Sequence, residues 1–236
     1  MIKVSPRTAV IAGASSGIGL ALARMLASRG FRLVLLARRR ELLEQIADEL
    51  PGDVITEVMD VGDVSAPEDF ARVLDELGTV DQIYLSAGTG HLNPGLDWSL
   101  EDETFRVNAL GFAGMAAAAY RFFERQGSGH LVGITSIAAL LGSAEAPAYN
   151  ASKACASRYL DGLRMRARAA KLPVYVTDIL PGFVDTAMMK AEKPFWVASP
   201  EKAAAQIISA VDRKNGRAYV SRRWGVVALL LRLLMK

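Results

Sequence analysis

The 236-residue sequence has very little cysteine and histidine, and it contains no long apolar run. Its one cysteine, Cys155, has no partner for an intramolecular disulfide, which excludes a disulfide-stapled scaffold and favours a reducing compartment. No group of His, Cys or carboxylate residues has metal-ligand spacing, so we expect no metal site.

Two further absences concern location and partners. No apolar stretch reaches the roughly 18 residues that indicate a membrane span, and the first strand-like run begins at Thr8, which leaves no room for a signal peptide. We therefore expect a cytoplasmic protein. The net charge of +3 is too small to indicate nucleic acid binding, and we expect none. Hydrophobic residues make up 51% of the chain, enough for a sizeable core, and we expect residues 1–236 to form a single domain.

The sequence does contain a regular alternation of apolar strands and helix-like segments. Strands are predicted at 8–12, 31–37, 54–59, 83–86, 131–135 and 174–180, and helices at 18–29, 40–50, 67–77, 104–125 and 149–171. Ser65 with Glu68 has capping-box spacing, and Ser199 with Pro200 indicates the start of another helix. Strands that are apolar throughout are buried on both faces, so the pattern predicts an α/β fold with a doubly wound, Rossmann-type parallel sheet. Ligands of such folds bind beyond the carboxyl ends of the strands.

A glycine-rich turn follows the first strand, with Gly13, Gly17 and Gly19 spaced G-x-x-x-G-x-G. Between a strand and a helix, such a turn lets backbone N–H groups approach a phosphate closely, so it predicts binding of a dinucleotide or another phosphate ester. The second strand ends before Arg38 rather than before a carboxylate. An arginine at this place pairs with a 2′-phosphate, which favours NADP(H) over NAD(H).

Tyr149 and Lys153 are four residues apart and therefore lie on one face of a predicted helix. A tyrosine has a pKa of ~10, so it works as an acid or base near neutrality only if its phenolate is stabilised, and a neighbouring ammonium supplies that stabilisation. Tyr and Lys also recur at this spacing on many surface helices. The Tyr149-Lys153 spacing therefore indicates a catalytic pair only together with the other motifs.

Taken together, the motifs resemble those of the short-chain dehydrogenase/reductase family, in its compact branch. The resemblance covers nearly the whole chain. It consists of the glycine turn, Asp60-Val61 after the third strand, Ser86-Ala87-Gly88 after the fourth, Asn108, Ser136 after the fifth strand, Tyr149 with Lys153, and Pro181-Gly182-Phe183-Val184-Asp185-Thr186 after the sixth.

The resemblance implies a role for each matching residue. The implied catalytic residues are Asn108, Ser136, Tyr149 and Lys153, with Tyr149 as the proton donor or acceptor, Ser136 as a second donor to the substrate oxygen, Lys153 lowering the Tyr149 pKa, and Asn108 positioning a water. The cofactor-binding residues are Gly13, Ser15, Ser16, Gly17, Ile18, Gly19, Arg38, Asp60, Val61, Ala87, Gly88, Tyr149, Lys153, Pro181, Gly182, Val184 and Thr186. The activity implied is NADP(H)-dependent interconversion of a carbonyl and a secondary alcohol.

Two departures and two alternatives accompany this interpretation. Ala12 stands where the family usually has Thr, and Ser86 stands where it usually has Asn, which puts the polar tie between the first and fourth strands in doubt. A 3-oxoacyl carrier-protein reductase is one alternative, because six arginines could meet an acidic carrier: Arg121, Arg125, Arg158, Arg164, Arg166 and Arg168. A non-catalytic NADP(H)-binding regulator is the other.

The last third of the chain carries the expectations about substrate and assembly. A short substrate lid is expected at 183–200, where Met188, Met189, Phe195 and Trp196 suit a small apolar carbonyl or alcohol, although ordinary core packing would use the same residues. Small residues on the two long helices suggest a homodimer or homotetramer, as is usual in the family. The apolar tail at 224–236 has no water-compatible face as a helix. It is expected over the cleft, in a subunit interface or, less favoured, in peripheral contact with a membrane.

Overall fold

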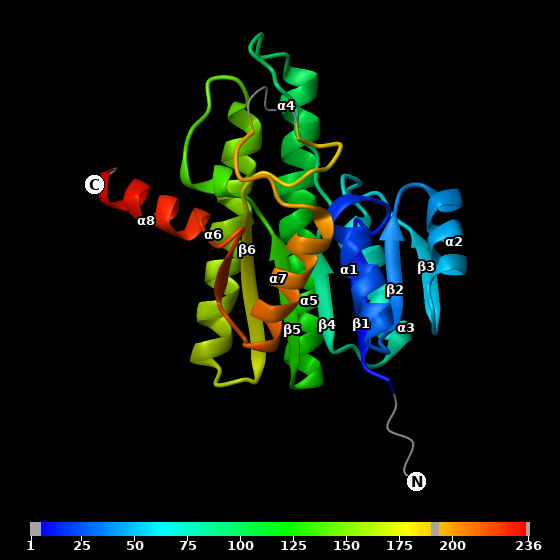
Figure 1. Ribbon diagram of the computed structural model, residues 1–236. Coiled ribbons are helices and arrows are strands. Elements are labelled where there is room, and N and C mark those ends of the chain that lie inside the picture. The colour runs from blue at the N-terminus through cyan, green and yellow to red at the C-terminus, as the bar shows by residue number, and fades with distance from the viewer. Residues whose placement is uncertain (1–5, 190–193, 235–236) are drawn as a thin grey trace.

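One seven-stranded parallel sheet forms the centre of the protein, as seen in the computed structural model, which describes residues 6–189 and 194–234 (Figure 1). The strand order is β3-β2-β1-β4-β5-β6-β7. The strands are β1 (Thr8–Ala12), β2 (Arg32–Ala37), β3 (Val54–Val58), β4 (Gln82–Leu85), β5 (Gly129–Ile134), β6 (Val174–Pro181) and β7 (Arg217–Val220). The order reverses between β1 and β4, so the predicted doubly wound sheet is confirmed.

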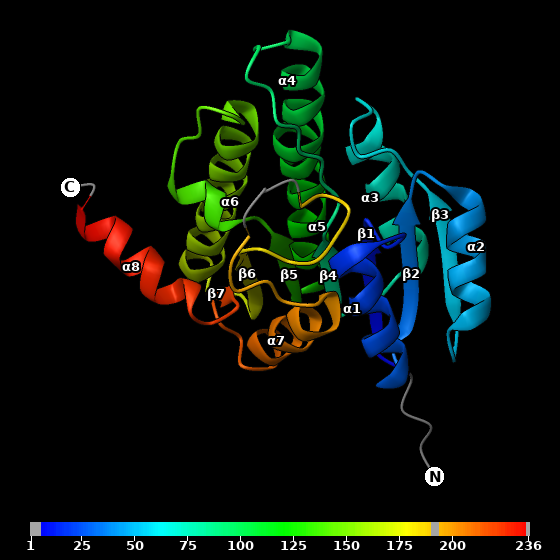
Figure 2. The ribbon, with the colours of Figure 1, turned by 45° about the horizontal axis from the view of Figure 1, so that its top comes forward.

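Helices cover both faces of the sheet. The helices α1 (Gly17–Ser28), α2 (Arg40–Glu49) and α7 (Pro200–Asp212) contribute to the apolar cluster on one face. The helices α3 (Ala66–Leu77), α5 (Phe112–Gln126) and α6 (Pro147–Ala169) contribute to the cluster on the other. Figure 2 shows the two helical layers with the sheet between them. Because β1, β2 and β4 lie between both clusters, their side chains are almost all buried, which explains their unbroken apolar sequences.

Three local features differ from the sequence-based prediction. The segment predicted as one helix at 104–125 is preceded by α4 (Trp98–Phe105) and contains a π-helical turn at Arg106–Gly111 before α5 begins. The strand β7 was not predicted, because only four residues of mixed polarity form it. The prediction of a capping box at the start of α3 is wrong. Ser65 already has helical backbone angles and its hydroxyl makes no cap hydrogen bond, whereas the Ser199 hydroxyl does cap α7 by accepting from the Lys202 N–H.

The chain ends in α8 (Trp224–Leu234), which leaves the body of the molecule at the β7 edge (Figures 1 and 2). This helix contacts β7 and the short 3-10 helix at Ile137–Leu140. Within residues 6–189 and 194–234, no helix combines the length and the apolar character that a bilayer crossing needs. Part of the expected lid, 190–193, and the end of the expected tail, 235–236, lie outside the described residues.

Candidate active site

The glycine turn forms a tight cradle between β1 and α1. A Cβ atom on Gly13 would lie 2.5 Å from the Ala87 nitrogen, and one on Gly19 would lie 2.1 Å from the Gly13 carbonyl oxygen. Gly17 has a φ of +54° and faces the Thr186 methyl group. Glycine is therefore required here for close approach, and the turn brings two further predicted site residues, Ala87 and Thr186, against it.

The first turn of α1 is open to an anion. Ser16 precedes the helix with extended backbone angles and makes no side-chain cap hydrogen bond, and the first turn holds no acidic residue. The first N–H groups of a helix lack intrahelical acceptors and carry the positive end of its dipole. Ser15 and Ile18 complete the turn, with the Ser15 hydroxyl accepting a hydrogen bond from Arg39 at 3.1 Å.

Arg38 lies directly after β2 and its side chain is 63% exposed. Its guanidinium is 3.7 Å from the Asp60 carboxylate, which follows β3 and also accepts a hydrogen bond from the Gly62 N–H at 2.9 Å. The exposed pair therefore joins the ends of two neighbouring strands. Val61 follows Asp60 and is buried. A Cβ atom on Gly111 would lie 1.9 Å from the Val61 carbonyl oxygen. The π-helical turn that contains Gly111 therefore packs directly on the chain that follows β3.

Asn108 is buried in that π-helical turn, and its amide holds the loop after β4. Its Oδ1 accepts from the Thr89 N–H at 2.9 Å, and its Nδ2 donates to the Thr89 carbonyl at 2.7 Å. A Cβ atom on Gly88 would lie 3.2 Å from Asn108 Oδ1 and 3.3 Å from Lys153 Nζ. Single π turns inside α-helices frequently occur at functional sites, and this one directs Asn108 toward Lys153.

Sequence reasoning missed the next contact along this loop. The His91 ring contacts the Thr89 hydroxyl at 3.3 Å and the Glu103 carboxylate of α4 at 3.1 Å. Gly90, between them, lies against the Tyr149 ring, because a Cβ atom there would be 2.9 Å from the ring. Thr89 is thus held by Asn108 through its backbone and by His91 through its side chain. Its place directly after Ser86-Ala87-Gly88 was the only available signal.

Tyr149 lies in the first turn of α6, next to Ser136 at the end of β5. Burial raises the pKa of Tyr149 above its ordinary value, and hydrogen bonding with Ser136 opposes that shift. The Lys153 Nζ is 5.9 Å from the Tyr149 ring centroid. In the protein alone the Tyr149 pKa is therefore raised rather than lowered. The lowering of this pKa by Lys153, which the family resemblance implies, stays a prediction.

Lys153 is a buried ammonium with few partners. Its side chain is 4% exposed, and it donates to the Ile134 carbonyl at 3.2 Å. Burial lowers the pKa of Lys153 to about 8, with the Asp178 charge opposing the shift. Among the described residues no carboxylate forms an ion pair with it. The ammonium therefore retains donor capacity for a ligand.

The remaining predicted site residues lie at the end of β6. Pro181 is the last residue of that strand, and Gly182 packs on the Trp224 indole, with a Cβ position only 1.9 Å from Nε1. Val184 is buried and bridges to Ala198. Beyond them the Met188 methyl lies 3.7 Å from the Cβ position of Gly88. Met188 therefore lies beside Gly88, which Asn108 and Lys153 also approach.

The aromatic residues of the expected lid differ from Met188, because they pack against one another and against Trp224. Phe195 lies 5.5 Å from Phe183 and 5.1 Å from Trp224 between ring centroids, and Trp196 lies 5.8 Å from Trp224. These four rings, Phe183, Phe195, Trp196 and Trp224, are called the aromatic cluster below. They join the described part of the lid to the base of α8. Phe195 and Trp196 are nevertheless 51% and 43% exposed, so neither ring belongs to the core, and a lining of the site by these residues stays a prediction.

The two departures from the usual family pattern leave the frame intact. The Ser86 N–H donates to the Ala12 carbonyl at 2.8 Å, so the backbone itself ties the end of β4 to β1.

His130, the second histidine, is buried and bonds the Thr177 hydroxyl at 2.8 Å. Its pKa is lowered to about 4 by burial, which makes it a neutral structural residue.

The observed residues fit a dinucleotide. The cradle at Gly13 and Gly19 leaves no room for side chains, the helix behind it offers free N–H groups, and Arg38 stands exposed at the neighbouring strand end. The predicted cofactor residues and the predicted catalytic residues all follow the carboxyl ends of parallel strands or lie on α6 and the π-helical turn beside them. The fold and this edge together define the class of dinucleotide-binding Rossmann proteins.

Comparison with known proteins narrows the class. The family model for short chain dehydrogenases matches residues 7–195. A Mycobacterium tuberculosis protein described as an uncharacterized oxidoreductase is 31% identical over 98% of this chain and 94% of its own. Another from Staphylococcus haemolyticus is 36% identical, covering 80% of this chain and 82% of its own. The chain belongs to the short-chain dehydrogenase/reductase family of oxidoreductases.

Solved structures agree on the fold. An alcohol dehydrogenase from Thermococcus sibiricus complexed with 5-hydroxy-NADP has a TM-score of 0.80 at 28% identity, covering 91% of this chain and 96% of its own. A Burkholderia phymatum short chain dehydrogenase/reductase in complex with NAD has a TM-score of 0.84 at 23% identity, covering 98% and 94%. The first of these complexes contains an NADP derivative and the second contains NAD.

Proposed function

We propose that the protein is an NADP(H)-dependent oxidoreductase that interconverts a carbonyl and a secondary alcohol, with Tyr149 as the acid and base. The observation that carries this proposal is the meeting of Tyr149, Ser136 and Lys153 on the sheet edge that also holds the glycine cradle. When bound, the nicotinamide supplies or accepts the hydride. The chain's own groups handle the proton and the developing charge.

Each side chain has a distinct part in this proposal. The Tyr149 hydroxyl donates its proton to the carbonyl oxygen of the substrate, or accepts it from the alcohol in reverse. Ser136 donates a hydrogen bond to the same oxygen and stabilises the negative charge that develops there. Lys153 holds a positive charge near the phenol and donates to the nicotinamide ribose. Asn108 fixes Thr89 and Gly88 so that this part of the wall keeps its shape.

NADP(H) is preferred because of the charge at the end of β2. Arg38 offers an exposed guanidinium there, and a phosphate accepts two parallel hydrogen bonds from such a group. The Asp60 carboxylate at 3.7 Å keeps the guanidinium near the strand ends. An acidic residue at position 38 would instead favour the ribose hydroxyls of NAD(H).

The carrier-protein alternative receives no support from the arginines on which it rested. Arg125 pairs with Asp75, Arg158 and Arg164 pair with Asp161, and Arg166 pairs with Glu124. Four of the six are thus engaged within their own chain. A regulator that only binds NADP(H) has no need of the Ser136, Tyr149 and Lys153 set, so we propose an enzyme.

The expectations about substrate, assembly and location remain predictions. The Met188 thioether beside Gly88 supports a small apolar substrate. Gly114 of α5 packs on Pro67 of α3 and so serves the chain's own fold, whereas a Cβ atom on Gly162 of α6 would meet nothing. A homodimer or homotetramer therefore has free surface on α6. The cytoplasmic location and the single-domain organisation likewise stay predictions.

The test is a screen of ketones, aldehydes and secondary alcohols for NADPH consumption or NADP⁺ reduction, with Tyr149→Phe as the matched control. The variant keeps the ring and loses the proton donor, so turnover should fall about 10²- to 10⁴-fold while NADPH affinity is retained. A variant that keeps most of the wild-type rate would show that Tyr149 is not the acid. Wild-type NADPH binding without turnover of any substrate would favour the regulator.

A further inference from the structure

The helix α8 has an outward face that nothing in the described chain covers. Trp224 and Ala228, one turn apart, are buried against the body of the molecule. Val226, Leu229 and Leu230 lie on the opposite side and are 63%, 59% and 53% exposed. Figures 1 and 2 show α8 extending away from the sheet and its covering helices. An apolar helix face held out into solvent indicates a contact with something apolar.

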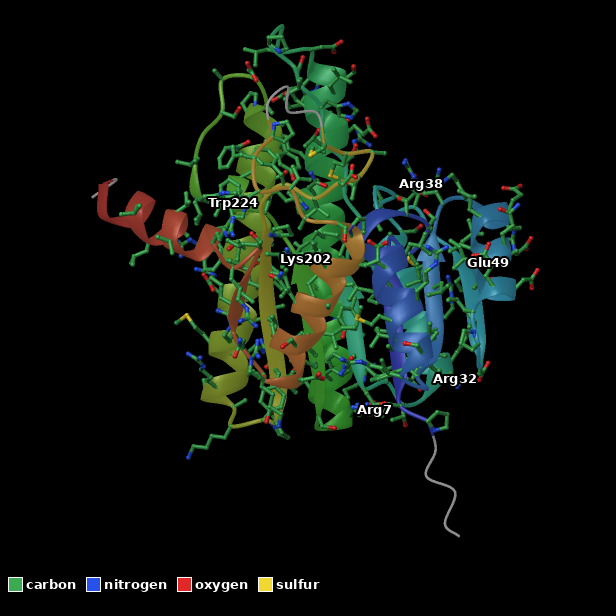
Figure 3. The ribbon with its side chains drawn as sticks, viewed as in Figure 1. Arg7, Arg32, Arg38, Glu49, Lys202 and Trp224 are labelled. Atoms are coloured by element: carbon green, nitrogen blue, oxygen red, sulfur yellow. The ribbon has the colours of Figure 1, made fainter. Side chains whose placement is uncertain are left out.

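The exposed apolar surface continues from α8 onto the lid. Phe195, Trp196 and Val197 are 51%, 43% and 41% exposed. The aromatic cluster ties them to Trp224, which Figure 3 marks at the base of α8. Aromatic rings with one apolar and one solvated side suit the boundary between a bilayer and water.

Three cations flank this surface. Lys202, Arg222 and Arg223 line a hollow of about 450 Å³ together with Trp196, and the Arg223 guanidinium lies 5.8 Å above the Trp196 ring. Across the part of the chain that the structure describes, none of the three has a carboxylate within ion-pair distance. This differs from α5 and α6, where most arginines are paired with acids of their own chain.

We propose that α8, residues 195–197 and the three cations form a docking surface for an anionic membrane, on which α8 lies in the headgroup region with Val226, Leu229 and Leu230 turned toward the acyl chains. An interfacial helix combines an apolar face with adjacent positive charge, and both are present. The helix lies on the bilayer and does not cross it, in agreement with its 11 residues.

A second copy of the chain fits this surface less well. In a two-fold interface the same patch meets itself, so two surfaces that each carry three cations would face one another. An anionic lipid surface instead complements every cation of the patch.

The experiment is co-sedimentation of the full chain with vesicles of phosphatidylcholine alone and of phosphatidylcholine mixed with phosphatidylserine. We expect binding to the mixed vesicles, weaker binding to phosphatidylcholine, and loss of binding as salt is raised. Arg222→Gln with Arg223→Gln should weaken the partition coefficient about fivefold per charge. Leu229→Ser with Leu230→Ser should weaken it at least tenfold. These readouts require no enzymatic activity, so they stand or fall separately from the proposed reaction.

Matched controls separate this surface from general charge and apolarity. Arg121→Gln with Arg168→Gln removes two exposed arginines from α5 and α6, and Met165→Ser removes a 69% exposed apolar side chain from α6. Neither should change vesicle binding, and all variants should keep the wild-type melting temperature. The proposal is overturned if anionic vesicles fail to bind the wild type, or if the controls weaken binding as much as the test variants. Light scattering in which Leu229→Ser with Leu230→Ser dissociates an oligomer, without vesicle binding by the wild type, would assign the surface to a second copy instead.

Discussion

Two buried charges near α6 differ in how their surroundings treat them. Asp178 of β6 is fully buried, and its carboxylate accepts from the Thr135 and Ser157 hydroxyls, each at 2.6 Å, and pairs with Arg217. Lys153 of α6 is buried almost as deeply, and among the described residues its ammonium donates only to the Ile134 carbonyl. A charge surrounded by partners holds the structure together, whereas a charge left short of partners is available for chemistry.

The pKa directions reflect this difference in solvation. Burial raises the pKa of Asp178, but Ser157, Thr135 and Arg217 each oppose the shift. Burial lowers the pKa of Lys153 to about 8, and only the Asp178 charge opposes it. The structural charge therefore supports the functional one through its field. Asp178 as a structural charge and Lys153 as a functional charge predict different effects of substitution, of which the largest comes first.

Lys153→Met should lower turnover about 10²- to 10⁴-fold, because the charge beside Tyr149 is lost. The free energy of unfolding at neutral pH should stay the same or rise, because Met fills a similar volume without a buried ammonium. Steady-state kinetics and urea unfolding measure the two effects. A variant that is strongly destabilised would place Lys153 with Asp178 among the structural charges.

Asp178→Ala should lower the free energy of unfolding by about 3–5 kcal/mol, since it leaves Arg217 and two buried hydroxyls without their acceptor. Asp178→Asn keeps one acceptor oxygen and should cost less. Urea unfolding of both variants at pH 7 measures the difference. If Asp178→Ala costs under about 1 kcal/mol, the contrast between the two charges is wrong.

The pH dependence of stability gives a third comparison. The folded pKa of Lys153, about 8, lies below its ordinary value of 10.5, so between these values the native state binds fewer protons than the unfolded state. The penalty for burying the ammonium is full below pH 8 and disappears as pH rises toward 10.5. This group therefore adds up to about 3 kcal/mol of stability across that window. In the cofactor-free protein, Lys153→Met should remove this rise, and an unchanged pH profile would contradict the assignment.

The sequence predicted the sheet, its helical cover and the edge that carries the site, because apolar strands and glycine spacing are local signals. It missed β7 because four residues of mixed polarity become a strand only through pairing with β6. It missed the π-helical turn at Asn108 because an extra residue in a helical turn leaves no mark in a 3.6-residue pattern. The aromatic cluster is likewise formed by tertiary contact between Phe183 and Trp224, residues that are distant in the chain.

Among the site residues, position along the chain was easier to predict than electrostatic state. The glycine turn and the Tyr149-Lys153 spacing predicted groups that the structure places at one edge of the sheet, while their roles stay predictions. Whether Lys153 is paired, and whether the Tyr149 pKa is raised, depends on burial and on partners from β5 and β6. The satisfied charge of Asp178 had no sequence signal either, since its partners come from Thr135, Ser157 and Arg217.

Arg38 provides the smallest effect on stability and extends the comparison to an exposed charge. Its pair with Asp60 is 3.7 Å long and lies in solvent, so Arg38→Gln should change the free energy of unfolding by less than about 1 kcal/mol. Arg38→Asp should move cofactor preference from NADPH toward NADH by about tenfold or more, because a carboxylate repels the 2′-phosphate. The ratio of kcat/KM for the two cofactors measures this shift.

Arg39→Asp is the matched control for that prediction, because Arg39 is the exposed neighbour that bonds Ser15. It carries the same charge one residue further along, where the chain has turned toward α2. Its preference ratio should move less than that of Arg38→Asp. Equal effects of the two substitutions would mean that the ratio follows the general positive field at the end of β2. A larger effect of Arg38→Asp would mean that one guanidinium reads the cofactor directly. In that case an exposed charge with little structural role decides specificity, as the poorly partnered Lys153 is expected to decide rate.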